Sequence, residues 1–226
     1  QISVDATPYY HCVSRCVRRS FLCGIDPLTE QSFEHRREWI KQKLYALSQV
    51  YCIDICAYAI MSNHYHLVVH INRDKAQALS NHEVVERWQQ EHKLPSLVSR
   101  WLSGQLTGDA ETEACLSIID SWRSRLWNLS WFMKELNFDI ACQANREEGC
   151  KGHFWESRFK SQALLDEQAL AAAMAYVDLN PLRAGIANTP ENSEFTSIQA
   201  RLEALNNQQE AAPCLHPFIG NPTNEK

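Results

Sequence analysis

The sequence YCIDICAYAIMSNHYHLVVHI occupies residues 51–71 and holds two apolar runs that are rich in β-branched residues. Tyr51–Ile60 and Tyr65–Ile71 are separated by the short stretch Met61-Ser62-Asn63, which His64 follows. Runs of this kind joined by a tight turn are typical of a β-hairpin. The sequence therefore predicts two adjacent antiparallel strands here.

Further elements are predicted on both sides of this hairpin. Upstream, alternation in residues 9–17 indicates a strand, and helical spacing in residues 32–50 indicates a helix. Downstream, apolar residues at three- and four-residue spacing predict one long amphipathic helix over residues 118–145. We then expect a hairpin at 152–165, an Ala-rich helix from Glu167 to Leu179 that Asp166 caps and Pro181 ends, and an outer helix near 195–206.

Residues 72–122 interrupt the strand pattern with five basic and eight acidic residues. Trp88 and Trp101 lie in this segment and need a place to be buried, so a folded helical insertion is favoured over a loop of 50 residues. Such an acidic lobe is expected to pack beside a ligand path or to dock a partner. We expect one domain over residues 1–198 with this insertion, followed by a polar tail at 199–226.

Composition places the chain among folded proteins. Of its 226 residues, 45% are hydrophobic, which excludes disordered and low-complexity classes. No apolar run reaches the roughly 18 residues of a membrane-spanning helix, and the first residues lack a signal-peptide pattern. The odd count of nine cysteines indicates reduced thiols, and a cytoplasmic protein without membrane contact is expected. Zinc at Cys12/Cys16 or Cys52/Cys56 is the less favoured alternative, because a four-residue step along a strand covers roughly 13 Å.

The formal charge of −5 is unusual for a nucleic-acid-binding protein, but basic residues concentrate in two segments. Arg15, Arg18 and Arg19 lie in the first, together with Arg36 and Arg37. In the second, residues 151–160, basic and aromatic residues alternate. This mixture suits a strand that holds single-stranded nucleic acid, and it equally suits a solvated strand over a packed aromatic face.

Two pairs of residues carry candidate chemistry. Side chains alternate along a strand, so His64 and His66 share one face about 6.6 Å apart and can clamp a divalent ion, whereas His70 is too distant to join them. Tyr176 and Asn180, four residues apart in the Ala-rich helix, project from one face as a nucleophilic phenol and a neutral oxygen ligand. Taken singly, these residues are better explained as polar strand positions, an amphipathic helix residue and a helix-ending turn.

Four motifs in order extend these observations. They are Tyr10-His11-Cys12-Val13-Ser14-Arg15, then residues 57–67 (AYAIMSNHYHL), residues 152–161 (GHFWESRFKS) and residues 176–185 (YVDLNPLRAG). Across residues 9 to about 198, apart from 72–122, the chain resembles the REP-associated tyrosine transposases, the single-tyrosine branch of the HUH endonucleases.

The resemblance implies an α+β fold, with a ferredoxin-like antiparallel sheet and helices packed on one face, in addition to the helical insertion. It implies Tyr176 as nucleophile, His64 and His66 as metal ligands, and Asn180 at the position of a third polar ligand. The metal would be Mg²⁺ or Mn²⁺, and the activity would be cleavage and strand transfer of single-stranded or hairpin DNA through a 5′-phosphotyrosine by a monomer or homodimer. Residues expected to line the DNA path are Arg15, Arg18, Arg19, Arg158, Lys160 and Arg183.

Two other functions remain open. One is a catalytically inactive regulator that binds nucleic acid with the same fold. The other is a zinc hydrolase that uses His64, His66 and a cysteine.

Overall fold

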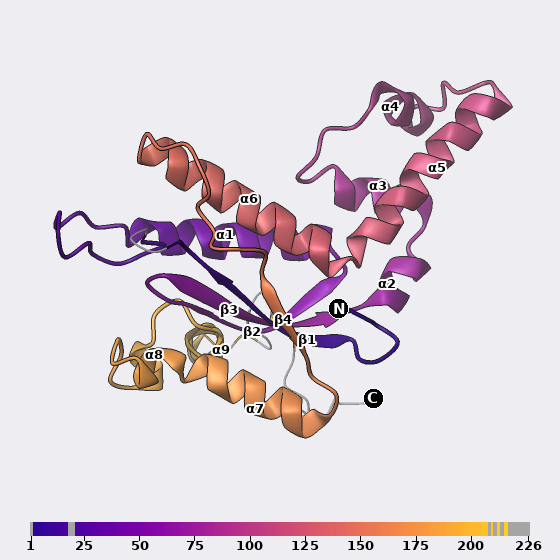
Figure 1. Cartoon of the computed structure of the whole chain (residues 1–226). Coiled ribbons are helices and arrows are strands. Elements are labelled where there is room, and N and C mark those ends of the chain that lie inside the picture. Colours follow the sequence, from indigo (N-terminus) through magenta and orange to yellow (C-terminus); the bar gives the residue numbers. More distant parts are fainter. Residues whose placement is uncertain (1, 18–20, 208, 210–211, 213–214, 217–226) are drawn as a thin grey trace.

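A four-stranded antiparallel sheet forms the centre of the computed structural model, which describes residues 2–17, 21–207, 209, 212, 215 and 216 (Figure 1). The strand order is β2-β3-β1-β4. The strands are β1 (Tyr9–Arg15), β2 (Ile53–Ile60), β3 (His64–Ile71) and β4 (Lys160–Ala163). The predicted hairpin is confirmed, with Met61 N–H donating to the His64 carbonyl at 2.9 Å across the turn. The α+β class is therefore confirmed.

Helices cover both faces of this sheet, which corrects the expectation of one covered face. On one face lie α1 (His35–Val50) and α6 (Leu129–Glu147); on the other lie α7 (Glu167–Asp178) and α9 (Ser197–Asn206) (Figure 1). The reason is visible in β2, where seven of eight residues are buried and both faces therefore need apolar cover. Each face accordingly has its own apolar cluster.

The Ala-rich helix α7 forms as predicted. The Asp166 side chain accepts a hydrogen bond from Ala169 N–H at 2.7 Å and so caps its first turn. Leu170, Met174 and Val177 are buried against the sheet. After Leu179 the chain begins a separate short helix, α8 (Asn180–Arg183).

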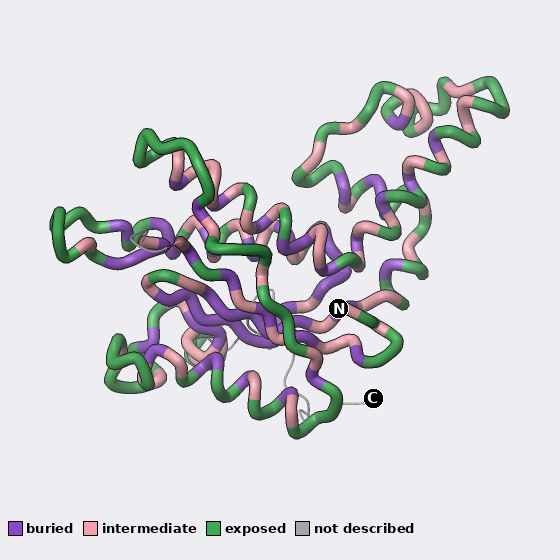
Figure 2. Tube along the Cα trace, viewed as in Figure 1, coloured by how far each residue is buried: buried purple, intermediate pink, exposed green. Residues whose placement is uncertain are grey.

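The insertion is a folded helical lobe, as predicted. Its helices are α2 (Arg73–Ala78), α3 (Asn81–Trp88), α4 (Ser96–Leu102) and α5 (Asp109–Leu126). Trp88 is buried and stacks on Trp122 at 5.3 Å between ring centroids, and Trp101 packs against the same apolar cluster. Figure 2 shows buried positions interspersed with exposed ones along these helices.

Two predicted elements are wrong. The helix expected over 118–145 is divided, because Asn128 accepts hydrogen bonds from Ser130 and Trp131 N–H groups and caps a new helix, α6. The hairpin expected at 152–165 contributes only β4. Its first half instead extends the pairing of β1, since Val17 N–H donates to the Phe154 carbonyl at 3.0 Å.

The C-terminal part returns to the sheet. A 3₁₀ turn, η1 (Pro190–Asn192), precedes the confirmed outer helix α9, which packs on the edge strand β2. The expected boundary after residue 198 falls inside α9. Leu215 then forms a parallel bridge with Ile55 of the same edge strand.

Candidate active site

Three histidines meet on the sheet face that α7 covers. Register pairs Val13 with His66 and Arg15 with His64, so these side chains share one face with His11. The Nε2 atoms of His64 and His66 lie 3.1 Å apart, and His11 Nε2 lies 3.0 Å from Nδ1 of His66. Strand alternation thus brings the predicted His pair together, with a third imidazole behind His66.

The surroundings of the His pair favour ion binding. Burial, followed by the charge of Arg15, lowers the pKa of His64 to about 4. Burial, followed by His64, His11 and Arg15, lowers the pKa of His66 to about 3. Both rings are therefore neutral at pH 7. His64 Nδ1–H donates to Asn63 Oδ1 at 2.6 Å, which leaves the lone pair on the Nε2 atom that faces His66.

Tyr176 lies above these rings on α7. Its ring centroid is 5.7 Å from that of His66 and 6.1 Å from that of His11, both in edge-on contacts. Tyr176 is 41% exposed, so a ligand can reach it. The Arg183 guanidinium lies 5.4 Å from the Tyr176 ring centroid, which places positive charge beside it.

Buried polar contacts hold this arrangement from both sides. Asp178, in the last turn of α7, accepts hydrogen bonds from the Ser197 hydroxyl and from Ile198 N–H at the start of α9. On the opposite face, the Tyr65 hydroxyl donates to Asn137 Oδ1 at 2.6 Å, and the Asn137 amide donates to Ser14 at 3.0 Å. These contacts connect the strands that carry the histidines to α6.

Asn180 is placed differently from the expectation. It begins α8 after the break at Leu179, so it does not follow Tyr176 on one continuous helix. Its side chain is half-buried. Within the described part of the chain, no hydrogen bond connects it to His64, His66 or Tyr176.

The basic residues expected along the DNA path are divided between two places. Arg15 and Arg183 lie at the histidine site, and Lys160 pairs with Val13 in register and so shares the histidine face. Arg158 lines a separate cleft. Arg18 and Arg19 lie outside the described residues. Arg36 and Arg37 are buried, and Arg36 is paired with Glu147 and Glu148.

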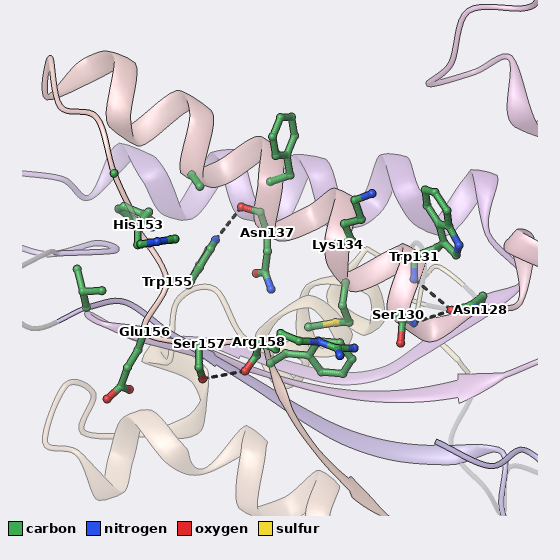
Figure 3. Close-up of a pocket in the computed structure, with 17 residues that line it drawn as sticks. Asn128, Ser130, Trp131, Lys134, Asn137, His153, Trp155, Glu156, Ser157 and Arg158 are labelled. Atoms are coloured by element: carbon green, nitrogen blue, oxygen red, sulfur yellow. Dashed lines mark hydrogen bonds between the residues drawn. The ribbon is translucent and has the colours of Figure 1, made fainter. Parts of the chain in front are cut away.

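The cleft of Arg158 opens on the α6 side of the sheet and has a volume of about 920 Å³ (Figure 3). One wall is α6 with Trp131 and Lys134, and the other is the 152–159 segment. Trp155 joins the two walls, because its indole N–H donates to the Asn137 carbonyl at 2.7 Å. Aromatic and basic side chains thus do gather in this segment, on the face away from Tyr176.

A further group of potential ligands lies elsewhere on the histidine face. Among the described residues, the metal-ligating atoms of Asp54, His70 and His216 all lie within 4.8 Å of one another. No sequence motif connects these three residues, because His216 is far from the other two along the chain. His11 was likewise not predicted as a site residue, although its alternation with Tyr9 and Val13 was a usable signal.

Comparisons with known proteins yield one structural similarity. No family model and no curated protein matches the chain. Among solved structures, the chain is similar to a REP-associated tyrosine transposase bound to a REP hairpin, with 13% identity and a TM-score of 0.48. The alignment covers 96% of this chain and 88% of that one. Across the described ranges, every helix is too short or too polar to cross a membrane.

Proposed function

We propose that this protein is a metal-dependent single-stranded DNA endonuclease and strand transferase that acts through a 5′-phosphotyrosine on Tyr176. The observation that carries the proposal is the position of the Tyr176 ring, 5.7 Å from the His66 ring, whose Nε2 faces that of His64. The four sequence motifs that contain these residues support it. Hairpin-forming repeat DNA is the proposed substrate.

The donor set fits a divalent metal ion. Two neutral imidazoles direct their Nε2 atoms at one point, and the Asn180 amide is the proposed third ligand. Imidazole nitrogen suits Mn²⁺, and Mg²⁺ is the alternative. When bound, the ion would supply positive charge that polarises the scissile phosphodiester.

The chain's own residues perform the transfer. The Tyr176 oxygen attacks phosphorus, forming a Tyr–O–P bond while the bond to the 3′ oxygen breaks. The phenol gives up a proton and the 3′ oxygen takes one up, so the step is balanced. Attack by a second 3′-OH reverses it without ATP, because one phosphodiester replaces another. Arg183 and Arg15 stabilise the negative charge of the phosphate.

Adduct formation tests this proposal. Hairpin DNA labelled at its 3′ end is incubated with protein and Mn²⁺, because a 5′-phosphotyrosine retains that fragment. We expect a covalent, protease-sensitive product that Tyr176→Phe abolishes. The half-exposed Tyr176 phenol makes no hydrogen bond within the described residues, so unfolding free energy should change by less than about 0.5 kcal/mol.

Tyr9→Phe is the matched control, because Tyr9 lies on the same sheet face beside His70, away from the His pair. This variant should form the adduct at the parental rate. An adduct that persists in Tyr176→Phe contradicts the nucleophile assignment. Hairpin binding without any adduct favours the inactive regulator, and zinc-dependent hydrolysis without an adduct favours the hydrolase.

A further inference from the structure

Asp54, His70 and His216 converge from three separate segments of the chain. Asp54 of β2 and His70 of β3 are direct cross-strand partners and therefore share one face. His216 reaches them because Leu215 and His216 lie along β2. Leu215 bridges Ile55 in parallel, and His216 N–H donates to the Ile55 carbonyl at 2.7 Å.

The distances among these side chains suit a single small cation. Asp54 Oδ2 lies 2.8 Å from His70 Nδ1 and 3.8 Å from His216 Nδ1. A tetrahedral ion with bonds of about 2.0–2.1 Å separates its ligand atoms by about 3.3 Å, between these two values. The amide of Asn72 also approaches Asp54 Oδ2 at 3.4 Å and can orient the carboxylate.

The three side chains of this group remain partly exposed to solvent. The side chains of Asp54, His70 and His216 are 22%, 19% and 32% exposed. Three protein ligands with one accessible side leave a coordination position for water. Two imidazoles and one carboxylate form a donor set that Zn²⁺ binds in proteins.

We propose that Asp54, His70 and His216 bind Zn²⁺ and that the ion holds Leu215 and His216 against the edge strand β2. Edge strands expose unpaired backbone groups, and a bound segment protects them from pairing with other chains. The site is separate from the His64/His66 pair, because four residues along β3 correspond to about 13 Å. The inference is independent of the proposed DNA chemistry.

Zinc titration by calorimetry tests this site in untagged, chelator-treated protein. The His64→Ala/His66→Ala double variant removes the other candidate site and should still bind one equivalent of Zn²⁺. Adding His70→Ala or His216→Ala to this double variant should raise the Kd for Zn²⁺ by more than about 100-fold. The loss of a residue that only orients a ligand raises the Kd by about 10- to 100-fold, so a larger increase indicates a direct ligand. His153→Ala, which alters an exposed histidine of the Arg158 cleft, should leave the Kd unchanged.

Melting curves separate lost ligation from lost folding. Zn²⁺ should raise the Tm of the double variant, and it should not raise the Tm once His216 is also replaced. His216→Ala alone should still form the Tyr176 adduct, so the zinc site and the proposed DNA chemistry fail independently. The inference is overturned if the double variant binds no Zn²⁺, or if its binding survives both His70→Ala and His216→Ala.

Discussion

Replacing His11 by Phe tests whether this residue orients His66. Its Nε2 lies 3.0 Å from His66 Nδ1, and the rings stack at 5.2 Å with an interplanar angle of 25°. Phe keeps a flat ring but loses the hydrogen bond. For an ion on Nε2 of His66, the Nδ1–H group donates to His11, and such charge-assisted bonds contribute about 1.5–3 kcal/mol. The Kd for Mn²⁺ should therefore rise roughly 10- to 100-fold.

Calorimetric titration with Mn²⁺ at pH 7 measures this effect. His11→Gln is the conservative control, because its amide oxygen can accept the same hydrogen bond and should recover part of the affinity. His66→Ala should abolish binding at this site, which sets the upper limit of the effect. An Mn²⁺ Kd for His11→Phe within about twofold of the parental value would refute the positioning role, since the measured range for outer-shell partners begins near tenfold.

Two further predictions concern DNA binding and the lobe. Lys160→Ala and Arg158→Ala should each reduce the slope of log K for DNA binding against log salt by about 0.7, the value for one phosphate contact on a single strand. An unchanged slope for Arg158→Ala would confine the DNA to the histidine face. The second prediction concerns the ion pair of His92 and Glu135, whose Nε2 and Oε1 atoms lie 2.8 Å apart. Burial disfavours the charged form of both groups. Their hydrogen bond outweighs this effect, so the pKa of His92 lies above 6.5 and the pKa of Glu135 lies below 4.5. The stabilisation from His92 is lost as pH rises through its folded pKa, and that from Glu135 is lost as pH falls through its own. Urea unfolding should therefore show an extra stability of about 1–2 kcal/mol between pH 4.5 and 6.5 that His92→Gln removes.

Local patterns predicted the parts of the fold that depend on near neighbours. The turn at residues 61–63, the Asp166 cap and the buried tryptophans of the lobe each follow from a few adjacent residues. The break at Asn128 was missed because apolar spacing continues across it. The two helices are separated by the extended backbone of Asn128 (ψ 106°), whose side chain caps α6.

Basic residues that are grouped in the sequence do not all lie on the surface of the fold. Arg36 and Arg37 belong to the basic group in the sequence, yet both are buried. Arg36 is bound to two acidic residues at the end of α6. A guanidinium that is enclosed by carboxylates within the fold is unavailable to phosphate. The count of basic residues therefore overestimated the positive surface available to DNA.

The candidate sites show where sequence reasoning stops. His64 and His66 are two residues apart on one strand, so alternation alone places them together. His11 joins them only through the register of β1 with β3, and His216 reaches His70 only because Leu215 and His216 lie along β2. Strand pairing between distant segments is set by packing over the whole sheet, which no short motif contains. The two His clusters are separated by the spacing along β3 itself, because His66 and His70 are four residues, or about 13 Å, apart on this strand. Each cluster can therefore be removed by substitution while the other remains in place.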